Sequence, residues 1–530
     1  MTKKKNTKKQ QPAAKPQAPA PKTPSGHIFL QVFVSGMAVM ALELSASRLY
    51  APYFGSSVFV WAGLIGALLL FLAIGYHIGG NMSRAGAGPD RLFMLTLAGS
   101  VYAGASPYIA MPVMSYMADR AGFFGNMLPG VLLTTLVALA APLILFGCAL
   151  PLATGILSRG ERDAGSVAGM LYALSTAGSI IGVFLPVLVT LPTIGTRLTF
   201  LVFSAAPALV AAAGLARVKW LLALIVFIPY GIMAHAIPIK GFAPGEKMIA
   251  ERETEYNYAR IVKQNGMRQM TIDQGWLTYS NIIPGRLKTD SYRDYFPLAK
   301  LLSGDPDYPK NVCILGAAGG TDARILKHTF PQTKITGVEI DPGLIELGNK
   351  YMELKAATDR IVISDGRAFL RADREKYDLI VVDVYNQSYI PFHMATVEFF
   401  LLVRERLTER GVVAFNVAWR TGDDMRLVHR CANTLSRVFP SVYIRQMAPK
   451  TNIILFATVK KTPLEKMNSV YNAVDNEYIR EIADENPIPL QIYSTNNKTN
   501  EVFTDDLAPV EQLTDDTIKE IAEYIRSSGS

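Results

Sequence analysis

The sequence predicts two unlike halves, an all-α transmembrane bundle followed by an α/β domain built on a mostly parallel sheet. Half of the 530 residues are hydrophobic and mean hydropathy is +0.21, which is too apolar for a disordered chain or an ordinary soluble enzyme. Residues 1–236 contain 16 Lys and Arg against five acidic residues, a net of +11, which leaves −2 of the total +9 for residues 237–530. Short β-like runs alternate with amphipathic segments only beyond residue 248.

We divide the chain into five segments. The first, residues 1–26, is rich in Lys, Pro, Gln and Ala and has almost nothing to bury, so we expect a disordered basic tail. The next four are expected to be a transmembrane bundle, a region with a small β-hairpin that acts as a gate, a Rossmann-like domain, and a mixed polar C-terminal segment. Their bounds are 27–237, 248–300, 301–460 and 461–530.

Seven apolar runs make up the bundle. About 20 apolar helical residues cross a bilayer core, and so many runs of this kind cannot all be hidden in one soluble core. Their Gly, Ala and Ser content suits close helix packing in lipid. The fourth run is long and contains Pro142 and Pro151, so it could be a broken or re-entrant element, and we expect seven or eight spans. The runs are 28–46, 58–80, 93–117, 128–157, 166–191, 198–215 and 219–237.

The second half alternates strands and helices. Residues 260–265 and 269–273 predict the hairpin, and six further β-like runs are separated by helical stretches. That alternation is typical of a doubly wound, mostly parallel sheet. The six runs are 312–316, 334–340, 360–364, 377–384, 411–417 and 452–459.

Glycines and carboxylates follow four consecutive predicted strands. The first ends in the turn Gly316–Gly320, whose small residues let backbone N–H groups approach a ligand. Glu339 lies at the end of the second strand, where a carboxylate can accept both ribose hydroxyls. Asp365 and Asp383 follow the third and fourth strands. Each acid alone could be a helix cap, but together they favour a nucleoside that carries positive charge, such as an S-adenosyl sulfonium.

These segments resemble the spermidine synthase (polyamine aminopropyltransferase) family over about residues 250–460. The resemblance rests on GAAGGTDAR, VEIDP, SDGRAFL and YDLIVVD, and on ETEYNY and Tyr292-Arg293-Asp294 further upstream. ALELSASRLYAPYFGSSVFVWAG, LYALSTAGSIIGVFLPVLVTLPTIGTR, IPFHMATVEFF and FTDDLAPVE are similar to a branch in which this domain follows a multi-helix membrane bundle. The resemblance implies a Rossmann-like domain of the S-adenosylmethionine-dependent methyltransferase type.

The resemblance also implies a role for individual residues. Asp383 would orient the attacking amine and help to remove its proton, a task that suits a carboxylate because only a neutral amine attacks. The nucleoside would be held by Asn257, Gly316, Gly319, Gly320, Glu339, Asp365 and Gly366. Weaker candidates for substrate contacts are Tyr292, Arg293, Asp294, Tyr385, Asn386 and His393.

Three departures from the family pattern weaken the case for a diamine acceptor. Asn386 stands where the family has a second Asp, Arg293 stands where it has His, and the glycine turn lacks its acidic residue. The missing acid would leave room for the carboxylate of ordinary S-adenosylmethionine, which Arg293 would pair. The donor is therefore expected to be either S-adenosylmethionine or its decarboxylated form.

Three functions remain open. The first is an aminopropyltransferase that releases methylthioadenosine, and the second is another S-adenosylmethionine-dependent enzyme, a methyltransferase or a lyase. The third is a membrane transporter or sensor whose soluble domain only binds the nucleoside. We expect a lipid bilayer and a small amine as partners, a possible homo-oligomer, no nucleic acid and no metal, since the six histidines and three cysteines lack ligand spacing.

The orientation in the membrane is ambiguous. A cytoplasmic N-terminal tail would put 13 Lys and Arg inside, seven of them in the tail, against five outside. Seven spans would then place the C-terminal domain outside, away from a cytosolic donor. We favour an integral protein of the plasma (inner) membrane with a cytoplasmic C-terminal domain.

One acidic residue, Glu43, lies within the first apolar run, five residues before Arg48. A charge inside a bilayer is costly and usually has a partner or a task. We therefore expect either a structural Glu43–Arg48 pair or a functional role for Glu43.

Overall fold

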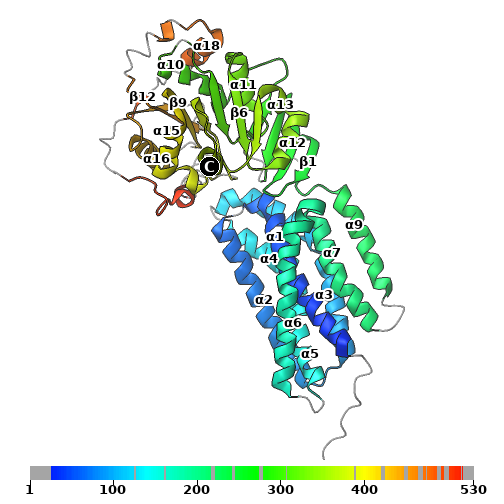
Figure 1. Cartoon of the computed structure of the whole chain (residues 1–530). Coiled ribbons are helices and arrows are strands. Elements are labelled where there is room, and N and C mark those ends of the chain that lie inside the picture. Colours follow the sequence, from blue (N-terminus) through cyan, green and yellow to red (C-terminus); the bar gives the residue numbers. More distant parts are fainter. Residues whose placement is uncertain are drawn as a thin grey trace, which may run out of the picture.

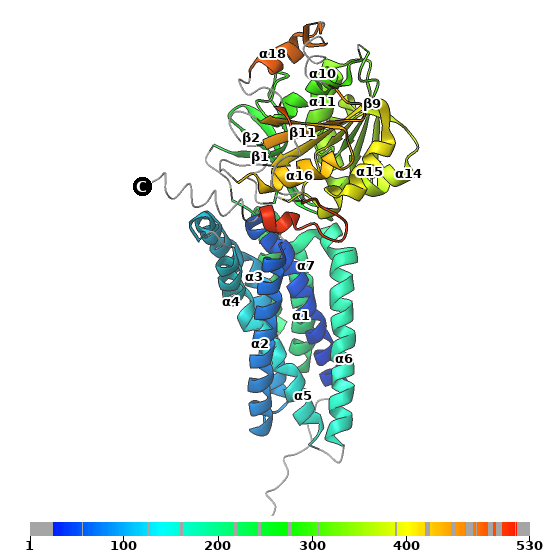
Figure 2. The same cartoon turned by 90° about the vertical axis from the view of Figure 1, so that its left-hand side faces the viewer.

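A computed structural model shows a bundle of long helices with an α/β domain at one end (Figures 1 and 2). The predicted tail lies almost entirely outside the residues that the structure describes, and so does most of the helix-like sequence after residue 514. The described residues are 25–55, 57–124, 127–159, 163–215, 221–241, 245–273, 278–305, 307–386, 389–418, 424–446, 452–462, 470–472, 474–485, 491–493, 501–514 and 516.

Among the residues described, the bundle contains five helices that are long and apolar enough to cross a membrane, the last of them 51 residues long. This last helix is broken at Gly195, where φ is 79° and ψ is 176°, and the parts before and after the break both pack against α1. The number of crossings, predicted as seven or eight, therefore stays a prediction. The helical elements are α1 Ser25–Phe54, α2 Val58–Arg84, α3 Pro89–Phe124, α4 Leu128–Gly147, α5 Ala149–Leu157, α6 Ala164–Leu185, η1 Pro186–Thr190, α7 Leu191–Gly214, η2 Leu222–Val226 and α9 Phe227–Ala236.

Glycines allow α1 and α6 to approach closely. A Cβ added to Gly178 would lie 2.1 Å from the Phe33 carbonyl oxygen, and one added to Gly182 would lie 2.1 Å from that of Met37. Backbones this close gain dispersion contacts that larger residues would prevent, which is the packing expected of helices in lipid.

The two ends of the bundle differ in what they contact. At one end Tyr53 Oη donates to the Ile239 carbonyl (2.7 Å) and Lys240 Nζ donates to that of Pro52 (2.8 Å), immediately before the α/β domain begins. At the other end Arg159 donates to the carbonyls of Ser83 and Gly86, both at 3.2 Å. The first turn of α1 lies at this far end, because His27 bonds to the Val210 carbonyl near the end of α7 (2.9 Å).

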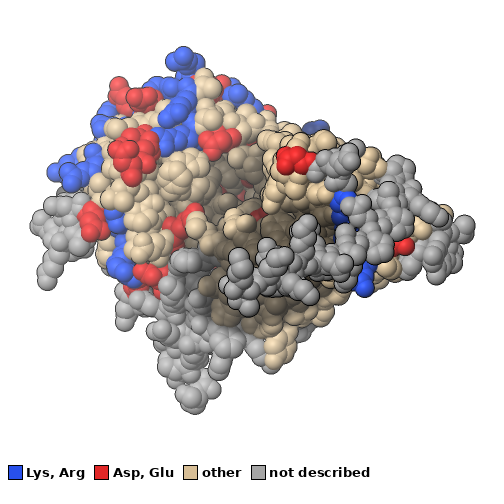
Figure 3. All heavy atoms as spheres, turned by 90° about the horizontal axis from the view of Figure 1, so that it is seen from below, with Lys and Arg blue, Asp and Glu red and all other residues tan. Residues whose placement is uncertain are grey.

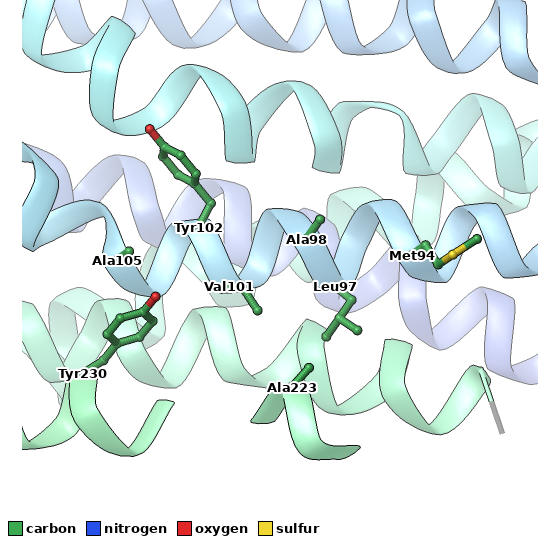
Figure 4. A pocket seen from close by; sticks show the side chains of 8 residues that line it. All are labelled: Met94, Leu97, Ala98, Val101, Tyr102, Ala105, Ala223 and Tyr230. Carbon is green, nitrogen blue, oxygen red and sulfur yellow. The ribbon is translucent and has the colours of Figure 1, made fainter. Parts of the chain in front are cut away.

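An apolar cavity of about 440 Å³ lies between α3 and the segment formed by η2 and α9. Leu97 of α3 points toward Ala223 across it (Figure 4). Seen from below, Lys and Arg (blue) and Asp and Glu (red) gather over one part of the molecule, and a broad area consists of uncharged residues (tan) (Figure 3). Both features fit a bundle with few charges.

The α/β half begins with a four-stranded antiparallel sheet in the order β1-β2-β3-β4. The predicted hairpin corresponds to β2 and β3, and the prediction missed β1 and β4 because neither shows a clear apolar alternation. Six of the seven residues of β1 are Lys, Met, Ala, Arg or Glu, which are weak strand formers. The strands are β1 Lys247–Glu253, β2 Tyr258–Gln264, β3 Met267–Ile272 and β4 Thr278–Ile282.

The Rossmann-like prediction is confirmed by an eight-stranded sheet in the order β12-β10-β11-β9-β8-β5-β6-β7. Strands β5 to β9 run parallel, and β10, β11 and β12 continue the sheet antiparallel. The sequence prediction missed β10 and β12. The strands are β5 Asn311–Leu315, β6 Lys334–Glu339, β7 Arg360–Ile363, β8 Tyr377–Val382, β9 Leu407–Ala418, β10 Ser441–Gln446, β11 Asn452–Thr458 and β12 Gln491–Ile492.

Helices cover this sheet, and its apolar core includes Phe399, Phe400 and Phe415, all fully buried. Helix α10 precedes β5 and lies far from the bundle (Figures 1 and 2), so the carboxyl edge of the parallel strands faces the bundle. The helices are η3 Tyr292–Leu298, α10 Ala299–Ser303, α11 Thr321–Thr329, α12 Pro342–Tyr351, α13 Leu354–Ala357, α14 Gly366–Ala372, η4 Phe392–Met394, α15 Val397–Arg406, α16 Arg426–Ser436 and α18 Glu477–Glu485.

Candidate functional site at the carboxyl edge of the sheet

The glycine turn after β5 requires residues without a side chain. Gly316 and Gly320 have φ values of 89° and 85°, a region that other residues rarely adopt. A Cβ on Gly316 would lie 2.2 Å from the Asp383 carbonyl oxygen. Because no side chain separates them, the turn and the end of β8 lie against each other, as the sequence predicted for ligand-binding residues at one edge.

Glu339, at the end of β6, is held by this turn. One carboxylate oxygen accepts from the Ala318 N–H (2.9 Å) and the other from the Asp341 N–H (3.1 Å). Burial raises the pKa of Glu339 to about 7, because water no longer stabilises the charged form. The carboxylate is fixed beside the glycine turn, where a ribose contact was predicted.

Asn257 reaches the same place from the antiparallel sheet. Its side-chain amide donates to Asp341 (2.9 Å), and Thr254 Oγ1 donates to the same carboxylate oxygen (2.5 Å). The other oxygen of Asp341 accepts from the N–H groups of Gly343 and Leu344 at the start of α12. Asp341 therefore joins the Thr254–Asn257 turn to Glu339.

This turn is also tied to the long apolar helix α1. Arg48 donates to the carbonyls of Thr254 and Tyr256, the latter at 3.1 Å. The expected Glu43–Arg48 pair is not formed, because the Arg48 side chain is engaged outside the bundle. The 6% exposed Glu43 stays within α1, and its predicted functional role remains untested.

Asp365 caps helix α14 and contacts His393. Its carboxylate accepts from the Ala368 N–H (2.8 Å) and lies 3.1 Å from His393 Nε2. The hydrogen bond with His393 holds the pKa of Asp365 below its usual range, so the carboxylate stays ionised. Asp365 is thus both the cap of α14 and the candidate adenine contact, and the loop that carries His393 lies against Asp365.

Asp383 is the centre of a polar cluster after β8. Tyr292 Oη lies 2.9 and 3.1 Å from its two oxygens, and the Asn416 amide donates to one of them (2.7 Å). Burial raises the pKa of Tyr292 well above its usual range, so its hydroxyl remains a donor. These contacts fix the orientation of the Asp383 carboxylate.

Arg293 lies between two carboxylates in this cluster. Its Nε is 3.4 Å from Asp322 and 3.8 Å from Asp383, and all three side chains are at most 7% exposed. Its Nη2 donates to the carbonyls of Thr278 and Tyr279, both at 2.9 Å. Two of its nitrogens therefore have protein partners, which does not favour the hypothesis that Arg293 pairs a donor carboxylate.

Asp322 is a site residue that the sequence analysis missed. It lies two residues after the glycine turn, in the first turn of α11. Burial and the neighbouring Asp383 raise the pKa of Asp322 well above its usual range. The signal in the sequence was the Thr-Asp pair at the N-terminus of α11, directly after the glycine turn.

Three weaker candidates do not join the Asp383 cluster. Asp294 accepts from Thr289, Ser291 and Tyr478 and closes a capping box at the start of η3, so the structure gives it a local structural role. Tyr385 Oη donates to the Asn416 carbonyl and accepts from the Ala418 N–H. Asn386 is exposed and pairs through its backbone with Tyr389.

Among the residues that the structure describes, no group of three or more His, Cys, Asp and Glu side chains is close enough to hold a metal ion. The described site instead offers carboxylates, a tyrosine and backbone N–H groups. Such groups recognise hydroxyls and cations.

Comparison with known proteins identifies the domain. Residues 298–468 match the family model described as "Spermine/spermidine synthase domain". A "Probable polyamine aminopropyl transferase" from Bifidobacterium longum is 30% identical over 291 residues, which are 52% of this chain and 64% of that protein. A "Polyamine aminopropyltransferase" from Vibrio vulnificus is 30% identical over 145 residues, 25% of this chain and 48% of that protein. The chain thus spans from just under half to just under two thirds of the length of these relatives.

Two further similarities are more distant. An "eEF1A lysine and N-terminal methyltransferase homolog" from Drosophila pseudoobscura is 29% identical over 160 residues, 28% of this chain and 23% of that protein. A crystal structure of a "probable spermidine synthase" from Corynebacterium glutamicum has a TM-score of 0.41 at 18% identity, covering 49% of this chain and 97% of that one. With the match to residues 298–468, the C-terminal part of this chain is a domain of the spermidine synthase/polyamine aminopropyltransferase family, and it follows an N-terminal region of five long apolar helices.

Proposed function

We propose that the protein is a membrane-bound aminopropyltransferase that moves an aminopropyl group from decarboxylated S-adenosylmethionine to an amine and releases methylthioadenosine. The observation that carries this proposal is the fixed Asp383 carboxylate beside the glycine turn, with Tyr292 and Asn416 as its donors. An attacking amine needs a group of this kind within reach to accept its proton.

The proposed reaction is an in-line displacement. The amine nitrogen forms a bond to the carbon beside the sulfonium as the carbon–sulfur bond breaks, and the electron pair stays on sulfur. The proton lost by the amine passes to Asp383. Because the leaving thioether is neutral, much of the rate comes from positioning the two partners and excluding water.

The donor would lie along the carboxyl edge of β5, β6 and β7. Glu339 would accept the ribose hydroxyls, and Asp365 with Gly366 would contact the adenine. The Asp322–Arg293–Asp383 group carries more negative than positive charge when both acids are ionised, which suits a cationic acceptor. Asp322, with its raised pKa, would hold a proton until the acceptor ammonium arrives.

A second candidate is methyl transfer from ordinary S-adenosylmethionine. It is favoured by Asn386 and Arg293, which replace the family's Asp and His, and by the relative from Drosophila that is named as a methyltransferase homolog. The product would be S-adenosylhomocysteine rather than methylthioadenosine.

Mass spectrometry of the purified full chain, incubated with either sulfonium donor and a pool of polyamines, tests both candidates. We expect methylthioadenosine together with an amine lengthened by one aminopropyl group, and we expect Asp383→Asn to form both products about 10²–10⁴ times more slowly. Asp305→Asn is the matched control, because Asp305 lies at the amino edge and contacts Arg410. Methylthioadenosine without a lengthened amine would indicate a lyase, and binding without turnover would indicate a sensor.

We further propose that the protein is integral to the plasma (inner) membrane with its C-terminal domain in the cytoplasm, where the donor is made. The charge distribution opposes this orientation, because Arg159 contacts the carbonyls of Ser83 and Gly86 at the end of the bundle away from that domain, next to Arg84 in the chain, and the seven tail lysines precede α1 in the sequence. Access to the donor places the C-terminal domain in the cytoplasm, whereas the positive-inside rule places it outside. A topology measurement decides between these two orientations.

A further inference from the structure

A polar pocket of about 320 Å³ lies where the bundle meets the antiparallel sheet. One wall comes from the first residues of α7, including Ile194 and Leu198, from the end of α9, and from Ile239 just after that helix. The other wall comes from β1 and β2 and includes Glu251 and Tyr258. None of the residues proposed to bind the donor or the acceptor lines this pocket.

Arg197 lines the pocket and lacks a full set of partners. Its side chain is 10% exposed, and its Nη1 is buried without a hydrogen-bond acceptor among the described residues. Its ion-pair partner Glu251 is 3.8 Å from Nη2, which is too long for a good hydrogen bond. A buried guanidinium that lacks a hydrogen-bond acceptor is costly, so an acceptor oxygen supplied by a ligand would stabilise it.

The two nearby carboxylates are not equivalent. Glu253 accepts from the Thr196 N–H (2.8 Å) at the helix break after Gly195, so it acts as a cap that joins the sheet to α7. Glu251 accepts from the Tyr258 hydroxyl through one oxygen. Its other oxygen faces Arg197 across the long contact, and the side chain is 28% exposed. The pocket therefore offers a cation that seeks an acceptor and a carboxylate that can take a donor.

The position of the pocket matches the depth of lipid headgroups. Helices α9 and η1 on this side present exposed apolar side chains, including Ile228 (62%), Ile232 (64%) and Leu188 (69%), which suit hydrocarbon. The wall formed by β1 and β2 already belongs to the polar α/β half. The site thus lies at the boundary between the apolar helix surface and the polar domain.

We propose that this pocket binds the headgroup of a phospholipid that carries both a phosphodiester and a primary ammonium group. The phosphodiester accepts from Arg197, and the ammonium donates to Glu251. This arrangement favours an aminophospholipid over a quaternary one, which has no N–H donor, and over a glycerol headgroup, whose hydroxyls can donate to the carboxylate but carry no positive charge to pair with it. The site does not depend on the reaction proposed above.

Native mass spectrometry of the full chain in detergent tests this site. The protein is incubated in turn with phosphatidylethanolamine, phosphatidylcholine, phosphatidylglycerol and inorganic phosphate. We expect phosphatidylethanolamine to be retained best and Arg197→Gln to reduce its retention at least tenfold. Glu251→Gln should abolish the preference for phosphatidylethanolamine while lipid binding persists. Lys247→Gln, an equal charge change at an exposed position of β1 outside the pocket, should have no effect.

Three outcomes would overturn the proposal. They are equal retention by Arg197→Gln, a preference for phosphatidylglycerol, or retention of inorganic phosphate as strong as that of the lipid. Arg197→Lys keeps the charge but loses the fork of donors, so it should retain part of the binding. If Arg197→Gln did not fold, Arg197→Lys would still distinguish the cases, since undiminished binding by a folded Arg197→Lys protein contradicts the role of the unpartnered Nη1.

Discussion

Replacing Arg48 with Gln is predicted to weaken donor binding, although Arg48 belongs to α1, a helix of the apolar bundle. Arg48 donates to the carbonyls of Thr254 and Tyr256, and Thr254 and Asn257 both donate to Asp341 beside Glu339. Without Arg48, the turn loses its anchor to α1 and must be ordered when the donor binds.

The magnitude follows from the two contacts. Hydrogen bonds from a charged donor contribute about 1.5–3 kcal/mol each, and the contact to Tyr256 is exposed and so counts for little. A total of about 1.5–3 kcal/mol would raise the Kd of the donor roughly 10- to 100-fold, since about 1.4 kcal/mol corresponds to a tenfold change. The value of kcat at saturating donor should change much less, because Asp383 and its partners stay in place.

Calorimetry with decarboxylated S-adenosylmethionine measures this effect on the detergent-purified protein. Arg84→Gln is the matched control, since Arg84 contacts Asn81 at the far end of the bundle. An unchanged Kd in a folded Arg48→Gln protein would refute the argument that α1 orders the turn. A loss confined to kcat would also refute it.

Four further predictions concern the site and the topology. Asp383→Asn should lower kcat by about 10²–10⁴ with little change in donor Kd by calorimetry, and a normal rate would remove Asp383 from the mechanism. Burial raises the pKa of Glu339 to about 7, so its carboxylate is protonated below that pH. Donor affinity measured by calorimetry should therefore fall as the pH drops below 7, and Glu339→Gln should bind the donor weakly at every pH. A wild-type affinity that does not change with pH would contradict this. Gly316→Ala adds a Cβ 2.2 Å from a carbonyl oxygen, at a residue with a φ of 89°. It should lower the free energy of unfolding in urea by more than Gly266→Ala does, because Gly266 has a φ of 79° but open space around it. Equal losses would refute the argument that the close approach requires glycine. A reporter that is active only in the cytoplasm should be active when fused to the C-terminus. Activity of a C-terminal reporter that works only outside the cytoplasm would reverse the proposed orientation.

The sequence was sufficient where one local pattern decides the structure. The turn Gly316–Gly320, Glu339, Asp365 and Asp383 each follow a parallel strand, and the topology brings them to one edge without further information. The apolar runs likewise predicted helices. Whether Ala164–Gly214 is one crossing or two depends on a single positive φ at Gly195, which hydropathy does not report.

Long-range partners could not be predicted in the same way. Asp322 looks like an ordinary acid at a helix start until η3 brings Arg293 beside it, and Arg48 looks like a partner of Glu43 until β1 and β2 dock on the bundle. Asp294 and Tyr385 belong to promising motifs but are used by nearby backbone and hydroxyl groups. Each of these contacts depends on the direction in which a side chain points, and several of them join elements that are far apart in the sequence.

Product analysis tests the central claim most directly. The full chain is incubated with decarboxylated S-adenosylmethionine and a pool of amines, and the mixture is analysed by mass spectrometry beside the Asp383→Asn variant. The proposed function predicts methylthioadenosine and an equal amount of an amine carrying one added aminopropyl group, both formed about 10²–10⁴ times more slowly by the variant. S-adenosylhomocysteine formed from ordinary S-adenosylmethionine, with no lengthened amine from the decarboxylated donor, would contradict it.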